Sequence, residues 1–217
     1  MNQLPRRLEL SLWVGLILTA LALLLALLLA QLKLRGFSKP LPVFGNVGEF
    51  TLTNQLAQPV HLANLKGRVW VADVIFTRCA GPCLTMTRAM KELQRVLPRD
   101  GKAQLISITT DPEYDTPAVL KRYGERFGAD PKRWTFLTGS KQEIQNLAVQ
   151  SLKLSVNEKT PQERSSTNDL FIHSTIFVIA DKKGRLRGIF ESTGQDVNTR
   201  KVRAQIQTAI RRLERER

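Results

Sequence analysis

Two residues of this chain have the type and spacing that thiol or metal chemistry requires. The only cysteines among 217 residues, Cys79 and Cys83, stand four positions apart in the run Cys79-Ala80-Gly81-Pro82-Cys83. Two thiols at this spacing can close into a disulfide or bind a soft metal ion. A structural disulfide here would close a very short loop and contribute little entropy. We therefore interpret the pair as working residues rather than as a cross-link.

The segments on either side of the cysteines predict how they are positioned. Residues 69–76 are almost all apolar and indicate a buried strand, whereas residues 84–97 indicate a helix. The cysteines are thus expected in a strand-to-helix turn, with Pro82 in the first helical turn. The unpaired N–H groups and the positive dipole end of that helix should favour thiolates and lower the pKa of the cysteines.

The remaining elements predict an α/β fold. Strands alternate with helices along the chain, and a final hairpin and helix follow. This order predicts a thioredoxin-like fold, with a central mixed sheet flanked by helices and an N-terminal hairpin extension. The further strands are expected at 50–54, 59–62, 103–109, 134–137, 174–180 and 185–191, the further helices at 117–127, 141–150 and from 198 onward, and an irregular stretch at 153–169.

A long apolar run near the N-terminus indicates a membrane anchor. Leu10 to Ala30 contains no charged residue and would extend about 30 Å as a helix, enough to cross a bilayer. Basic residues stand on both sides of the run, so charge alone does not fix its orientation. A cleaved signal peptide is the alternative, but no small-residue cleavage site follows Ala30. The expected domains are an anchor at 1–35, a linker at 36–48 and a folded domain at 49–217.

Charge and composition exclude some classes of function. The formal net charge is +14, but lysine and arginine are scattered, and no zinc-finger or RNA-binding signature is present. We therefore expect no nucleic-acid partner. Part of the excess of positive charge is consistent with a surface that faces anionic lipid, although a generally basic soluble surface explains it as well.

Four further groups of residues stand out along the chain. They are Phe76-Thr77-Arg78-Cys79 with Cys83, Ser107 to Asp111 followed by Pro112-Glu113-Tyr114-Asp115-Thr116-Pro117, Phe136-Leu137-Thr138-Gly139, and His173-Ser174 before a strand with Asp181 and Gly184 in its turn. In these motifs the chain resembles the Sco/SenC family of membrane-anchored copper-binding proteins, which assist cytochrome c oxidase assembly. The similarity extends from about Phe50 to Ile210.

The resemblance implies that Cys79, Cys83 and His173 bind one copper ion. Thiolates select Cu(I), and imidazole also tolerates Cu(II), so either oxidation state fits this set of ligands. Zinc accepts the same ligands, although structural zinc sites close with four. Asp111 is a candidate for a supporting role beside the metal, and no catalytic residue is assigned.

The resemblance also implies partners and a location. The copper-site subunit of cytochrome c oxidase would receive the metal, and an external thiol reductant would keep Cys79 and Cys83 reduced, because an oxidising compartment closes such pairs into disulfides. The apolar helix would contact membrane lipid. The location implied is the bacterial cytoplasmic membrane, with a single span and the soluble domain on the periplasmic side.

A second class of function stays open. The same two cysteines, as a redox-active disulfide, suit a thiol–disulfide oxidoreductase that reduces the cysteines of the oxidase copper site or of other targets outside the cytoplasm. A distant histidine favours the metal carrier, since a dithiol reductase needs none. We interpret His61, Met86 and Met90 as structural. Asp73 either bonds near the cysteine turn or faces a partly wet edge.

Overall fold

The structure, a computed structural model, describes residues 6–36, 40–79, 81–98, 102–163, 170–192 and 197–216, without the side chains of 6–9, 32–36, 161, 172 and 173. The chain divides into two compact units, Met1–Pro40 and Leu41–Arg217. The first consists of helix α1 (Arg6–Gly36). Within α1, Leu10–Gln31 has 22 residues and a mean hydropathy of 2.8, so α1 is long and apolar enough to cross a membrane.

The second unit is built on a mixed eight-stranded sheet in the order β1-β10-β9-β4-β5-β6-β2-β3. Strands β4, β5 and β6 are parallel, and β9, β10 and β2 run antiparallel to their neighbours. The strands are β1 (Gly45–Asn46), β2 (Thr51–Asn54), β3 (Pro59–His61), β4 (Val69–Ile75), β5 (Ala103–Thr109), β6 (Trp134–Thr138), β9 (Ile176–Ala180) and β10 (Arg185–Glu191).

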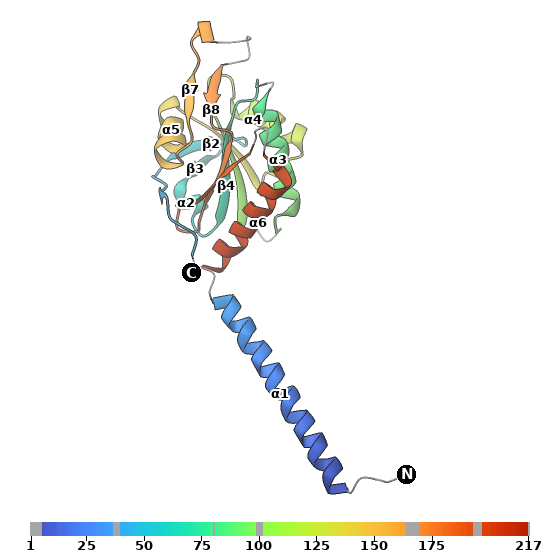
Figure 1. Cartoon of the computed structure of the whole chain (residues 1–217). Coiled ribbons are helices and arrows are strands. Elements are labelled where there is room, and N and C mark those ends of the chain that lie inside the picture. Colours follow the sequence, from blue (N-terminus) through green and yellow to red (C-terminus); the bar gives the residue numbers. More distant parts are fainter. Residues whose placement is uncertain are drawn as a thin grey trace. The chain divides into compact units, whose positions relative to one another are not determined.

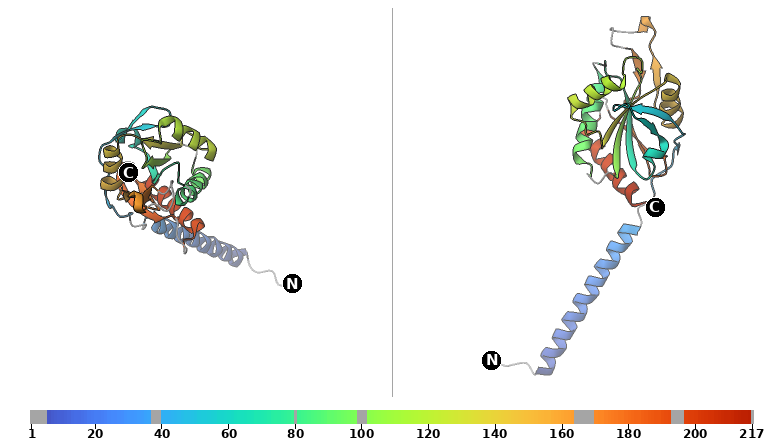
Figure 2. Two further views of the ribbon diagram at one scale, coloured as in Figure 1. Left: turned by 90° about the horizontal axis from the view of Figure 1, so that it is seen from above. Right: turned by 180° about the vertical axis from the view of Figure 1, so that it is seen from behind.

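Helices cover both faces of this sheet, as the two views of Figure 2 show. Helices α3, α4 and α6 pack on one face and α2, α5 and η1 on the other (Figure 1). The bounds are α2 (Leu62–Leu65), α3 (Pro82–Val96), α4 (Pro117–Phe127), α5 (Lys141–Gln145), the π-helix η1 (Asn146–Ser151), the 3₁₀-helix η2 (Pro161–Glu163) and α6 (Thr199–Arg215).

Alternation along the central strand explains the two faces. In β4, Val69, Val71 and Ile75 join the core under α3, α4 and α6, whereas Trp70 and Val74 join the opposite core. Every residue of β4 and β5 is buried. Strands covered on both faces read as continuous apolar runs, which is why the sequence pattern located them.

Local capping sets the helix ends close to their predicted positions. Thr116 accepts a hydrogen bond from the backbone N–H of Val119, and Pro117 begins α4. Gly128 ends α4 with a φ of 70°, a conformation that glycine adopts without strain. Asn198 caps α6 in the same way as Thr116 caps α4.

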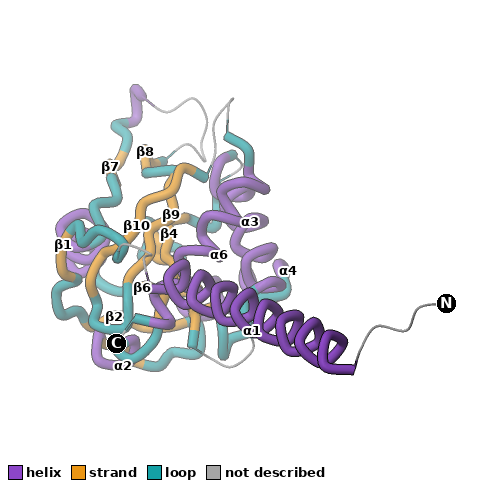
Figure 3. Tube along the Cα trace, turned by 60° about the horizontal axis from the view of Figure 1, so that its bottom comes forward, coloured by secondary structure: helices purple, strands orange, loops and turns teal. Residues whose placement is uncertain are grey.

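Three regions differ from the prediction. The expected linker at 36–48 contains β1, which pairs with β10. The expected irregular stretch at 153–169 contains β7 (Val156–Glu158), which pairs with β8 (Phe171–His173) in a separate two-stranded sheet. This β7–β8 pair extends beyond the end of the main sheet (Figures 1 and 3). The expected helix at 141–150 widens into a π-helix after Gln145.

Candidate metal centre

The two cysteines lie in a buried turn between β4 and α3. The backbone N–H of Cys79 donates to the carbonyl of Phe76 at 3.2 Å, and Pro82 is the first residue of α3, so Cys83 is the second. The exposed fractions of Cys79 and Cys83 are 9% and 0%, and both are present as thiols. Both join the core that contains Met86 and Met90, which confirms the core interpretation of these methionines.

The pKa of the Cys83 thiol differs from what its position at the start of α3 suggests. A hydrogen bond to the side chain of Cys79 and then burial raise its pKa well above the ordinary value for cysteine. The expectation of a lowered pKa is therefore wrong for Cys83. The dipole of α3 is outweighed, because a buried thiolate loses its hydration and stands beside a second sulfur.

Asp115 fixes the start of the cysteine turn from the neighbouring strand end. Its carboxylate accepts hydrogen bonds from the backbone N–H of Thr77 at 3.0 Å, from the Thr77 hydroxyl, and from the Thr109 hydroxyl at 2.5 Å. Asp115 is fully buried, and burial raises the pKa of its carboxyl although these hydrogen bonds act in the opposite direction. The turn after β4 is thus joined to the turn after β5.

Asp111 supports the same turn through an arginine. The Arg78 guanidinium donates to one carboxylate oxygen of Asp111 from Nε at 3.1 Å and from Nη2 at 2.5 Å. Arg78 also lies over the ring of Tyr114, 4.3 Å from its centroid. Asp111 therefore contacts the residue that precedes Cys79, and its predicted role beside a metal stays a prediction.

A buried polar chain lies on the same face of the sheet as the cysteines. Asp73 accepts a hydrogen bond from the hydroxyl of Ser107 at 2.6 Å, and that hydroxyl accepts one from the Trp134 indole at 3.0 Å. Asp73 is fully buried, and its negative charge is one of the smaller influences that raise the pKa of Cys83. The partly wet edge considered for Asp73 is therefore wrong, because the residue is fully buried.

The strand that carries His173 lies against the cysteine turn. The ring of Phe171, in β8, packs edge-to-face on the ring of Phe76, with 5.2 Å between the centroids. Leu170, just before β8, is buried in the same core cluster as Cys79 and Cys83. The side chain of His173 is outside the described residues, but its backbone pairs with Val156.

The other histidine serves local structure. His61 is exposed in β3, its ring nitrogen Nδ1 lies 3.1 Å from the Thr51 hydroxyl, and its backbone N–H donates to Asn64 at the start of α2. Among the described residues, no group of three His, Cys, Asp or Glu side chains forms a metal site. The His173 side chain was not among them, so the predicted set Cys79, Cys83 and His173 stays a prediction.

The donor chemistry nevertheless fits a soft metal ion. Two thiols in mutual contact offer the sulfur ligands that Cu(I) prefers, and the adjoining β8 carries an imidazole. Sequence reasoning missed Thr77, Arg78 and Asp115 as supports of this turn. Threonine, arginine and aspartate are ordinary turn residues, so only the contact between the two turns gives them this role.

Comparison with known proteins identifies the family. The SCO1/SenC family model matches residues 43–211. The SCO1 protein homolog of Bacillus subtilis (strain 168) is 37% identical over 147 residues, which cover 67% of this chain and 73% of that protein.

Similarity to solved structures supports the same family. BsSco, described as a member of the Sco family of cytochrome c oxidase assembly proteins with a disulfide switch, has a TM-score of 0.67 and 28% identity, over 82% of this chain and 100% of that one. Copper-bound ScoI of Bradyrhizobium japonicum has a TM-score of 0.61 and 25% identity, over 76% of this chain and 99% of that one. These similarities confirm the expected thioredoxin-like fold. The chain belongs to the SCO1/SenC family.

Proposed function

We propose that this protein is a membrane-anchored copper carrier that binds one copper ion through Cys79, Cys83 and His173 and delivers it to cytochrome c oxidase during assembly. Two similar proteins support the proposal: ScoI of Bradyrhizobium japonicum has been solved with copper bound, and BsSco belongs to a family of cytochrome c oxidase assembly proteins. The observation that supports it is the packing of Phe171, two residues before His173, on Phe76, three residues before Cys79.

Each protein group has a distinct task in this proposal. The two thiols lose their protons and hold the metal as thiolates, which select the soft Cu(I) ion. The imidazole adds a nitrogen donor that both Cu(I) and Cu(II) accept. Three protein ligands leave one side of the ion accessible to ligands of the receiving subunit. Hydrogen bonds from Thr77 and Arg78 to Asp115 and Asp111 hold the cysteine turn during the exchange.

Anchoring and redox state complete the proposal. Helix α1 holds the protein in the bacterial cytoplasmic membrane, in contact with lipid, and residues 49–217 face the periplasm. In that oxidising compartment, Cys79 and Cys83 close into a disulfide unless an external thiol reductant returns them to thiols. Copper loading then depends on the reductant.

A thiol–disulfide oxidoreductase is the second candidate. The side chains of Cys79 and Cys83 are already in hydrogen-bond contact, as a pair that forms a disulfide requires, and BsSco is described as having a disulfide switch. In this function Cys79 and Cys83 reduce a disulfide of the target, and their own two thiols become the disulfide while the target gains the two thiols.

Copper stoichiometry of the full-length protein in lipid nanodiscs tests the proposal. We expect one copper ion per reduced protein and none per oxidised protein, because a disulfide offers no thiolate. Equal binding by both forms contradicts the proposed site. The His173→Ala variant separates the two functions: a carrier loses copper transfer to the oxidase subunit, whereas a dithiol reductase keeps its reduction rate. His61→Ala is the matched control and should change neither.

A further inference from the structure

A groove lies between α3 and α6 on the face of the sheet that also bears the cysteine core. Its volume is about 350 Å³. Leu93, Phe177 and Ile206, each almost fully buried, contribute the apolar floor. Arg88, Arg200 and Arg203 contribute the basic rim. We term this hollow, whose edge also includes Thr85 and Thr199, the arginine groove.

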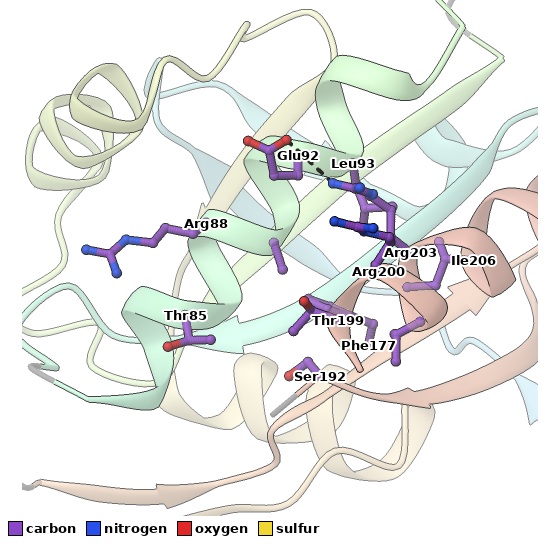
Figure 4. A pocket seen from close by; sticks show the side chains of 12 residues that line it. Thr85, Arg88, Glu92, Leu93, Phe177, Ser192, Thr199, Arg200, Arg203 and Ile206 are labelled. Carbon is purple, nitrogen blue, oxygen red and sulfur yellow. Dashed lines mark ion pairs between the residues drawn. The ribbon is translucent and has the colours of Figure 1, made fainter. Parts of the chain in front are cut away.

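The charge of this rim is only partly compensated. Figure 4 shows Arg200 and Arg203 reaching from α6 toward Glu92 on α3, while Arg88 extends outward from α3. Arg203 lies 3.5 Å from the Glu92 carboxylate. In the part of the chain that the structure describes, the side chains of Arg88 and Arg200 form no hydrogen bond or ion pair. Two guanidinium groups therefore stand at the rim of an apolar hollow with their donors available.

We propose that the arginine groove binds an acidic segment of a partner protein, with one apolar side chain of that segment on the groove floor. The guanidinium fork matches the geometry of a carboxylate and can donate two parallel hydrogen bonds to it. An apolar anchor in a pocket surrounded by charged contacts is the usual form of a protein docking site. The combination of floor and rim thus selects a segment that alternates carboxylates with an aliphatic or aromatic residue.

The position of the groove relates it to metal exchange. Thr85, which also lines the groove, follows Cys83 by two residues in the first turns of α3. A protein that approached the cysteines would also cover this end of α3. The partner is then the subunit that receives copper, and this identification rests on the proposed function.

The size of the groove favours a protein segment over lipid. A volume of about 350 Å³ is near the lower limit of pockets that enclose small ligands, so it holds one or two side chains rather than a full acyl chain. The hydroxyl groups of Thr85 and Thr199 at its edge suit the polar backbone of a peptide.

Peptide titration of the full-length protein in zwitterionic nanodiscs tests the inference. The probe is the synthetic peptide Glu-Leu-Asp-Phe-Glu, and its amide counterpart Gln-Leu-Asn-Phe-Gln is the control. We expect the acidic peptide to bind with a dissociation constant below about 1 mM, and the amide peptide at least about tenfold more weakly. Shifted NMR signals of Leu93, Phe177 and Ile206 locate the site.

Matched variants remove or keep the groove charges. The double variant Arg88→Glu/Arg200→Glu should weaken binding of the acidic peptide by at least about tenfold. The double variant Arg122→Glu/Arg211→Glu makes the same charge change at exposed positions outside the groove and should change binding by less than about twofold. If the glutamate variant unfolds, Arg88→Gln/Arg200→Gln replaces it, because glutamine adds no repulsive charge. This variant should weaken binding of the acidic peptide, but by less than the glutamate variant would.

Several results would overturn the inference. They are equal binding of the acidic and amide peptides, equal weakening by the two double variants, and no binding of the acidic peptide at about 1 mM. Shifts of the floor residues in anionic nanodiscs without peptide would identify lipid as the occupant instead. The copper stoichiometry of the same proteins is measured separately. If the wild-type protein binds no copper, the proposed function is refuted, but the result of the peptide titration still stands.

Discussion

The cysteine turn and the β7–β8 pair carry the two halves of the proposed copper site, and they are held in different ways. The cysteine turn connects the fully buried strand β4 to the long helix α3, and Asp111 and Asp115 bond it to the turn after β5. The β7–β8 pair has three residues in each strand and lies outside the main sheet. A pair of short strands is marginal by itself and depends on packing against its surroundings.

This difference suggests how the protein both holds and releases a metal. The sulfur half is fixed by the core, so its geometry persists without metal. The imidazole half depends on a few contacts, of which Phe171 on Phe76 is the clearest. In the proposed carrier, a partner could therefore displace His173 from the metal without disturbing the core.

The largest effect is expected from removal of a sulfur donor. Cys83→Ser should weaken Cu(I) binding by about 1000-fold or more, since loss of even an outer partner of a metal ligand costs about 10–100-fold. Competition with a chromophoric Cu(I) chelator measures the affinity. Thermal unfolding provides the control, because the hydroxyl is buried where the thiol was. Unchanged copper affinity in a folded variant would remove the cysteine half from the account.

The next largest effect is expected from loss of the hydrogen bonds that support the cysteine turn. Asp115→Asn puts an amide N–H₂ opposite donors from Thr77 and Thr109, so we expect the free energy of unfolding to fall by about 3 kcal/mol. Urea unfolding of the metal-free protein measures it. Asp130→Asn, at a partly exposed turn, is the control and should change stability by less than about 1 kcal/mol. Equal losses would show that the cysteine turn needs no special support.

The pH dependence of copper affinity should come from the cysteine thiols rather than from His173. The pKa of Cys83 is raised by its hydrogen bond to Cys79 and by burial, so its thiol is protonated at neutral pH and copper must displace that proton. Affinity should therefore rise as pH rises, by about tenfold per pH unit for each proton displaced. Chelator competition between about pH 7 and 9 measures this slope. The slope should persist in His173→Ala, and a flat profile in the wild-type protein would contradict the raised pKa.

The smallest effect is expected at the contact between the halves. Phe171→Ala removes an aromatic pair worth about 1 kcal/mol, so copper affinity should fall by about fivefold if the pair positions β8. Unfolding free energy should fall by a similar amount, because Phe171 is only partly buried. Val156→Ala, on the facing strand, should act in the same direction. A copper affinity that is insensitive to both changes would separate β8 from the metal site.

The two halves also differ in how well the sequence predicts them. Buried apolar runs and caps such as Thr116 located β4, β5 and α4 almost to the residue, because local patterns determine those elements. The β7–β8 pair escaped prediction, since three-residue strands show no periodicity and their pairing depends on tertiary packing.

In the candidate site, too, the sequence predicts local features but not contacts between distant residues. The two cysteines and their turn were evident from spacing alone, whereas the bonds of Asp111 and Asp115 join residues 33 and 38 positions apart. The raised pKa of Cys83 was missed for a related reason, because burial and a neighbouring sulfur are properties of the folded turn.

In the proposed site, an imidazole from β8 joins the two sulfurs on one copper ion. Two spectra test this arrangement: electron paramagnetic resonance of the protein loaded with Cu(II), and X-ray absorption of the protein loaded with Cu(I), which is silent in electron paramagnetic resonance. Both are compared with those of His173→Ala and His61→Ala. We expect sulfur and nitrogen ligands in the wild type and in His61→Ala, and loss of the nitrogen signal in His173→Ala. Identical spectra for wild type and His173→Ala would contradict it.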